Sequence, residues 1–376
     1  MAEIGARVAQ ARKLAGLTQG AVAEVLGTDK TAMSKIEHGR RRLDGFELAL
    51  VAERLGTTAR ELLGLPSRRP VLAIAARLGS DDARTGPAIR RAQQLLELDA
   101  LADELELSDA AAPARPVEAP PTGTGRERAT MLAAALRNEL GLGVAGIGDL
   151  VGLCERSCGL DVAIEPLGDG PSGLLVHHSD VVALALLNAD DRAARQRFTL
   201  AHELGHHLFG DPAELIVEDG HNDVDTERRA DRFAVELLLP EAAVQRSAGD
   251  GPVHNKTVVD GMIHFGVSRE AYVNRLRDLR IISSETRQSF LSVGVRSLFA
   301  AAGRSADFEE WSGGVGTRRA PARMERRLLD AYRTGRIGIG PVAQLVGRDA
   351  DDLRGELDDA GMSPTFSEHD FAFDLI

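Results

Sequence analysis

The chain has 376 residues, of which 43% are hydrophobic and 27% charged, a balance typical of globular proteins that bury a core. No apolar run approaches the ~20 residues that a membrane-spanning helix needs. The N-terminus lacks the apolar segment of a signal peptide, so we expect a cytoplasmic protein. Two cysteines exclude a disulfide scaffold, and the length allows two or three domains.

The charge is unevenly divided along the chain. A net charge of −12 is unusual for a nucleic-acid-binding protein. Residues 1–65, however, carry ten Lys and Arg against eight Asp and Glu, which leaves −14 for the remainder. A mildly basic head on an acidic body is compatible with DNA binding by the head alone.

The head, residues 1–65, has the pattern of a helix-turn-helix domain. Apolar residues recur at helical spacing, and capping residues such as Thr18 and Asp29 precede new helices. Two short helices separated by a turn that contains glycine, the second of them rich in polar residues, are typical of this motif. Five helices are expected, over residues 4–15, 19–26, 30–37, 44–55 and 58–63.

Leu17-Thr-Gln-Gly-Ala-Val-Ala-Glu-Val-Leu-Gly27 and Met33-Ser-Lys-Ile-Glu-His-Gly-Arg-Arg41 together resemble the XRE-type (lambda-repressor-like) DNA-binding domain. The resemblance implies a partner, double-stranded operator DNA, and an internal structural role for Glu37. It also implies that four side chains face the major groove: Lys30, Thr31, Ser34 and Lys35. Gln19 and Arg40 would then lie near phosphates. The alternative interpretation is a helical bundle that binds a protein or only dimerises.

Residues 66–128 are expected to connect the head to the rest of the chain. Prolines at the start of this segment interrupt the helices. Residues 87–107 then predict a long helix, which would suit either a packing arm or the contact of a homodimer. Residues 110–125 are rich in Pro, Ala and Gly, a composition typical of a mobile linker.

A domain of mixed α+β class is expected over residues 129–285. The two cysteines, Cys154 and Cys158, lie in an amphipathic pattern that favours buried thiols over a metal or redox site. Helices are expected over 126–140, 147–158 and 241–284, and strands of a small sheet over 159–165, 173–178 and 181–188.

The segment from Phe198 to Gly210 contains His-Glu-x-x-His. On a helix, His202 and His206 lie on one face, so both imidazoles can reach a single metal ion. Glu203 can act as a general base toward a metal-bound water. A catalytic zinc needs one more protein ligand and keeps its fourth position for water.

That third ligand is expected on a second helix, residues 226–240, where Glu227 and Asp231 lie one turn apart. Glu227 is the predicted ligand, and Asp231 is placed to accept the free N–H of a liganding histidine. Zinc is the predicted ion, although histidine and carboxylate ligands also accept manganese. The apolar strand over 181–188 is expected to be an edge strand that pairs with an extended substrate.

Arg197-Phe-Thr-Leu-Ala-His-Glu-Leu-Gly-His-His-Leu-Phe209 and Glu227-Arg-Arg-Ala-Asp-Arg-Phe-Ala-Val-Glu-Leu-Leu-Leu-Pro240 closely resemble the ImmA/IrrE family of zinc metallopeptidases. The resemblance covers roughly residues 130–285. It implies a zincin-like fold of the gluzincin type, with zinc on His202, His206 and Glu227 and with Glu203 catalytic. It also implies a protein substrate, typically a DNA-binding repressor that is cleaved under stress or on induction of a mobile element.

The remaining histidines give weaker signals. His177 and His178 are interpreted as exposed turn residues, and His207 as a surface residue or a neighbour of the metal ligands. Three residues are candidate donors to a transition state, and no spacing argument separates them: His254, His264 and Tyr272. Residues 286–376 are expected to be a helical C-terminal region of unknown role, with a helix pair over 323–333 and 341–357.

The sequence therefore predicts a multidomain protein, with an all-α head, an α+β metallopeptidase domain and a helical C-terminal region. The predicted function is a DNA-binding transcriptional regulator with a zinc-dependent endopeptidase domain that cleaves a repressor or another regulatory protein. One alternative is a transcription factor whose metal site is structural or sensory. A second alternative is a regulator of a defence or toxin–antitoxin system.

Overall fold

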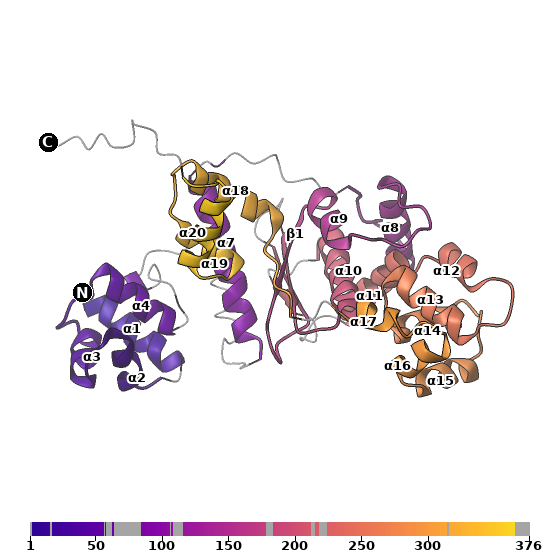
Figure 1. Cartoon of the computed structure of the whole chain (residues 1–376), viewed down its shortest axis with the longest axis horizontal. Helices are drawn as coiled ribbons and strands as arrows, with labels where there is room; N and C mark the ends of the chain where they lie inside the picture. Colours follow the sequence, from indigo (N-terminus) through magenta and orange to yellow (C-terminus); the bar gives the residue numbers. More distant parts are fainter. Residues whose placement is uncertain are drawn as a thin grey trace. The chain divides into compact units, whose positions relative to one another are not determined.

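The structure is a computed structural model (Figure 1). It describes residues 2–15, 17–55, 57, 62–63, 84–105, 107, 116–177, 183–211, 215–217, 224–313 and 316–364. The chain divides into two compact units, Met1–Gln93 and Gln94–Ile376. None of the helices in the described ranges is both long and apolar enough to span a membrane.

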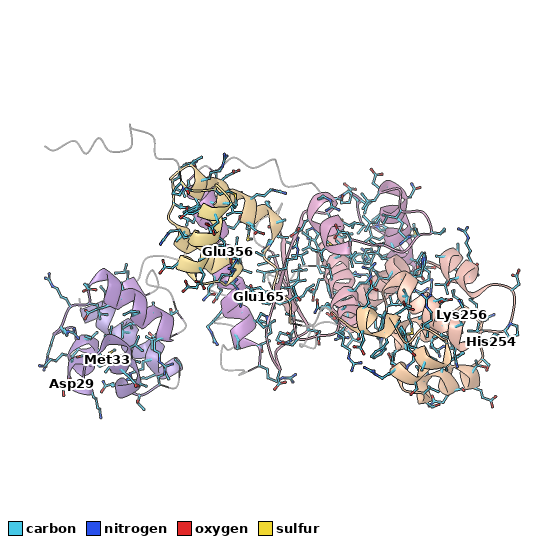
Figure 2. The ribbon with its side chains drawn as sticks, viewed as in Figure 1. Asp29, Met33, Glu165, His254, Lys256 and Glu356 are labelled. Carbon is cyan, nitrogen blue, oxygen red and sulfur yellow. The ribbon has the colours of Figure 1, made fainter. Side chains whose placement is uncertain are left out.

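Short helices build the first unit, as the sequence predicts. Thr18 and Asp29 begin two of them, because each side chain accepts a hydrogen bond from the backbone amide three residues on. Met33 lies inside the unit and Asp29 at its rim (Figure 2). Residues 58–61 of the expected fifth helix lie outside the described residues. The helices are α1 (Ala2–Leu14), α2 (Gln19–Ala23), a 3-10 turn (Glu24–Leu26), α3 (Lys30–Glu37) and α4 (Gly45–Leu55).

A mixed four-stranded sheet forms the second unit's centre, in the order β1-β3-β2-β4. β1 and β3 are parallel, whereas β2 runs antiparallel to both β3 and β4. The sequence predicted three of these strands and missed the short fourth one. The strands are β1 (Leu160–Glu165), β2 (Gly173–His177), β3 (Ala183–Asn188) and β4 (Leu215–Val217).

The expectation that residues 181–188 form an edge strand is wrong. β3 lies between β1 and β2, and all six of its residues are buried. An uninterrupted apolar run of this kind is typical of a strand that is covered on both faces, and it does not indicate a position at the edge of the sheet. The edges are instead β4 and β1, and β1 is extended by a backbone bridge between Ile164 and Arg319.

Helices cover this sheet, and the two that carry the predicted metal ligands lie together beside it (Figure 1). α10 (Ala193–Phe209) packs on β2 and β3, and α11 (Val224–Leu238) packs on α10 and α8 (Gly125–Glu139). The other helices of this part are α9 (Leu150–Ser157), α12 (Glu241–Ala248), α13 (Asn255–Phe265), α14 (Arg269–Asp278), α15 (Ser284–Ser292), α16 (Val295–Ala301) and α17 (Asp307–Ser312).

Between residues 322 and 359 the chain forms three helices where the sequence predicted two. Gly347, with φ 67°, ends α19, and the Asp349 side chain then caps α20, so the expected helix over 341–357 is divided. α7 (Gly86–Glu104) meets this region through Asp99, a buried carboxylate paired with both Arg323 and Arg327. The three helices are α18 (Ala322–Arg333), α19 (Ile339–Val346) and α20 (Ala350–Asp359).

Candidate metal centre and DNA-binding helix

α10 is buried along most of its length. Every residue from Thr199 to Leu208 is buried, and this stretch includes three histidines and a glutamate. Burial of polar side chains is costly unless they bind a partner. The helix ends at Gly210, whose φ of 64° is the left-handed conformation that glycine adopts most readily.

The side chains of His202, His206 and Glu227 converge on one point. The Nε2 atoms of the two histidines are 3.0 Å apart. Glu227 Oε2 lies 3.1 Å from His202 Nε2, and Glu227 Oε1 lies 3.4 Å from His206 Nε2. Ligands about 2.1 Å from a tetrahedral zinc ion lie about 3.4 Å from one another. The three donors therefore have the chemistry and the spacing to hold one metal ion.

A carboxylate lies beside the outer nitrogen of each histidine. His202 Nδ1 is 2.9 Å from Asp231 Oδ1, the contact that the helical spacing predicted. His206 Nδ1 is 2.8 Å from Asp211 Oδ2, and Asp211 is also paired with Arg229. Such contacts orient the ring and direct the other nitrogen to the metal.

Asp211 is the residue of this cluster that sequence reasoning missed. It is buried and follows directly after Gly210, the residue that ends α10. Its contact with His206 depends on the chain reversal at that glycine, so no helical spacing could predict it. The sequence did offer one signal for this contact, which is a carboxylate directly after the glycine that ends the helix of the His-Glu-x-x-His motif.

The electrostatics of the cluster favour a cation. Burial alone lowers the pKa of His202, but Asp231, Glu227 and the charge of Glu203 outweigh burial and raise that pKa to about 10. The pKa of His206 is raised in the same way, against burial, by carboxylates that include Asp211 and Glu227. The carboxylate of Glu227 shows the opposite shift. Burial acts to raise the pKa of Glu227, but the two imidazoles hold that pKa well below its usual range.

Glu203 and His207 flank the ligand positions on α10. Glu203 is fully buried, and its charge acts on both His202 and His206. His207 is buried too, so the interpretation of His207 as a surface residue is wrong. Its Nε2 lies 2.9 Å from the backbone carbonyl oxygen of Cys158, and this contact ties α10 to the end of α9.

The candidate transition-state donors lie in different surroundings. Tyr272 is fully buried, with its hydroxyl 3.1 Å from Ser247 Oγ. His264 is exposed, and His254 lies at the surface beside Lys256 (Figure 2). The side chain of His177 and all of His178 lie outside the described residues.

The two cysteines are buried thiols, as expected. Burial raises the pKa of the Cys158 thiol to about 12 and that of Cys154 well above its usual value. Both side chains belong to the hydrophobic core of the second unit. The two cysteines therefore contribute to the packing of this core.

In the first unit, α3 presents Lys30, Thr31 and Lys35 as exposed side chains, with Ser34 half-buried. Arg40, just after the helix, is also exposed.

The half-buried Gln19 donates its side-chain amide to Glu37, at 2.7 Å, and Arg12 Nε donates to the same carboxylate at 2.5 Å. Glu37 thus binds α1, α2 and α3 together, in agreement with the internal role that the resemblance implies. It ties the start of α2 to the end of the helix that carries the exposed polar residues.

Comparison with known proteins gives two family matches. A helix-turn-helix family matches residues 8–62, and the IrrE N-terminal-like domain of the M78 peptidases matches residues 156–277. None of the curated proteins compared matches the chain. Among solved structures, the apo form of the competence regulator ComR from Streptococcus vestibularis is similar at 13% identity. The match covers 97% of this chain and 99% of that chain, with a TM-score of 0.16. The chain therefore joins an N-terminal XRE-type helix-turn-helix domain to an IrrE N-terminal-like domain of the M78 peptidase family.

Proposed function

We propose that the chain is a cytoplasmic transcriptional regulator that binds operator DNA and whose second unit is a zinc-dependent endopeptidase. The observation that supports this most strongly is the convergence of His202, His206 and Glu227, with Glu203 buried on the same helix. A purely structural zinc site has four protein ligands. Within the described residues, only three such donors form a group.

In this proposal His202, His206 and Glu227 would hold zinc, which would supply Lewis acidity toward the attacking water and the scissile carbonyl. Glu203 accepts the proton of that water and passes it to the leaving amine. Asp231 and Asp211 keep the two imidazoles oriented, because each accepts the N–H of one ring.

The proposed substrate is a protein, and a DNA-binding repressor fits best, because the head would bring the peptidase to proteins bound nearby on DNA. An extended substrate segment needs a strand edge with which to pair. β4 is the terminal strand at one side of the sheet, whereas a backbone bridge to Arg319 occupies part of the β1 edge. We therefore assign substrate pairing to β4.

Metal analysis tests the site. Purified full-length protein should contain about one zinc per chain, and His202→Ala should lose it. His264→Ala, which removes an exposed histidine of the same unit, should retain it. Absence of metal from the wild-type protein would refute the proposed site.

Cleavage is tested by Glu203→Gln. The variant should keep its zinc but lose proteolysis, because the amide cannot accept the proton of the water. Cells that express wild-type protein should yield new protein N-termini that are missing from cells with the variant. Identical N-termini in both, with zinc bound in both, would favour the sensory or structural alternative over a peptidase.

A further inference from the structure

Asp211, which lies beside His206 Nδ1, also contacts an arginine of the other ligand helix. Its Oδ2 atom is 2.8 Å from His206 Nδ1, and its Oδ1 atom accepts a hydrogen bond from Arg229 Nη2. The Asp211 backbone N–H donates to the His206 carbonyl oxygen at 3.2 Å, which holds this residue against the end of α10. Arg229 stands on α11, two residues after Glu227. One carboxylate therefore connects a metal-binding candidate of α10 to the helix that carries the third donor.

Burial makes a cation beside this carboxylate necessary. The Asp211 side chain is 6% exposed, so water does not solvate its charge, and a neutral imidazole N–H supplies no opposite charge. Arg229, whose side chain is 14% exposed, supplies that charge. Asp231, the carboxylate beside His202, is 58% exposed and is solvated by water. The support of His206 therefore depends on a paired cation, whereas the support of His202 can rely on solvent.

Packing fixes the position of the guanidinium group. Its central carbon lies 4.2 Å from the centre of the Phe209 ring, in the last turn of α10, which is the geometry of a cation–π contact. Phe209 in turn meets Phe233 of α11 edge to face, with ring centres 6.3 Å apart. Arg229 thus contacts the end of α10 through this ring, and the segment that follows α10 through Asp211. A separation of α11 from the end of α10 would break both contacts.

We propose that Arg229 is a positioning residue of the metal centre, because its pairing with Asp211 holds the His206 ring in the orientation that directs Nε2 to the ion. The inference rests on the proposed zinc site and adds a residue that does not itself bind zinc. Since Arg229 and Glu227 share a helix, the same ion pair keeps Glu227 near His206. Loss of the arginine would leave a buried carboxylate without its cation, and Asp211 would then turn from His206 toward water.

The zinc affinity of the full-length protein, measured by competition with a zinc-binding dye, tests this role. Arg229→Met keeps much of the side-chain volume but removes the charge, and it should weaken zinc binding by about tenfold or more. Arg229→Lys restores a cation and should recover part of the lost affinity. Arg232→Met is the matched control, because Arg232 is a half-buried arginine of the same helix whose partner is Glu236. The control should bind zinc as wild type does.

Two further readouts separate positioning from a general loss of stability. With Co²⁺ in place of zinc, Arg229→Met should show altered visible absorption bands, because these bands report the arrangement of the ligands around the ion. In the Asp211→Asn background, Arg229→Met should weaken zinc binding by less than about threefold, because the effect of the arginine passes through Asp211. If the Met variant does not fold, Arg229→Gln takes its place in every measurement.

Three results would overturn the inference. The first is an Arg229 variant that binds zinc as tightly as wild type, and the second is a Co²⁺ spectrum identical to that of wild type. The third is an equal loss of zinc affinity with and without the Asp211 carboxylate, which would assign Arg229 to general stability. A wild-type protein that binds no zinc would instead refute the proposed metal site itself, and this inference with it.

Discussion

At the scale of single residues, each histidine of the candidate metal centre uses both ring nitrogens. The Nε2 atoms of His202 and His206 face each other and Glu227, while the Nδ1 atoms face Asp231 and Asp211. An imidazole held in this way has one tautomer and one orientation available. The outer carboxylates thus prepare the site before any ion binds.

Asp211→Asn should weaken zinc binding by about 10- to 100-fold, the usual effect of removing a carboxylate that supports a liganding histidine. The substitution removes the negative charge that faces His206 and Arg229. Competition with a zinc-binding dye measures the change in affinity. Asp225→Asn, at an exposed position on α11, is the control, and equal affinities of the two variants would contradict the prediction.

Glu37 should make the stability of the head depend on pH. Burial alone would raise its pKa, but hydrogen bonds from Arg12 and Gln19 hold the pKa below its ordinary value of 4.5. The unfolded state then binds more protons as the pH falls. The stabilisation is therefore complete above pH 4.5 and is lost as the pH falls through the folded-state pKa.

Hydrogen exchange of the α3 amides in the full chain measures this effect. Glu37→Gln should lower the local stability by about 3 kcal/mol at neutral pH, because it leaves Arg12 without its charged partner. The difference between variant and wild type should shrink in acid. Glu24→Gln, at an exposed position, should behave as wild type at every pH.

At the scale of elements, the candidate metal centre depends on the close approach of α10 and α11. A Cβ atom at Gly205 would lie 3.0 Å from the Phe233 ring and 3.4 Å from Ala230 Cα. Glycine at this position, between the two histidines of the motif, lets the helix that carries Glu227 come near enough to complete the donor set. Side-chain volume at Gly205 therefore controls ligand geometry.

Gly205→Val should lower the free energy of unfolding by about 1–3 kcal/mol and weaken zinc binding, because the larger side chain separates α10 from α11. Chemical denaturation and metal competition measure the two effects. Gly355→Val places the same side chain in α20, where a Cβ atom meets nothing within 4 Å. That control should change stability by less than about 0.5 kcal/mol.

The same scale explains which elements could be predicted. The bounds of α3 follow from the cap at Asp29 and the apolar spacing of Met33 and Ile36, which are local properties. The edge position assigned to 181–188 was wrong because strand order depends on partners far along the chain. Apolar content reports how much of a strand is buried, not which strands lie beside it.

At the scale of the whole molecule, the helix-turn-helix domain, which implies DNA binding, and the candidate metal centre belong to different compact units. The exposed polar residues of α3 lie in Met1–Gln93, and the metal-binding candidates lie in Gln94–Ile376. The mildly basic head and the strongly acidic remainder are consistent with this division. The two activities should therefore be separable by substitution.

Arg40→Ala should weaken binding to duplex DNA of any sequence and reduce the slope of log affinity against log salt by about 1, with zinc content unchanged. His202→Ala should lose zinc and keep its DNA affinity. Fluorescence anisotropy over a series of salt concentrations gives the slope. Lys256→Ala, which removes an exposed cation of the second unit, should leave the slope unaltered.

The sequence by itself determined the helix-turn-helix pattern, the shared face of His202 and His206, and the spacing that puts Glu227 and Asp231 one turn apart on a second helix. These features repeat with the helix period, which any local stretch of chain carries. Only the tertiary structure decided that Asp211 faces His206 and that His207 is buried. Those contacts arise where the chain reverses or where distant elements pack, and no local periodicity records them.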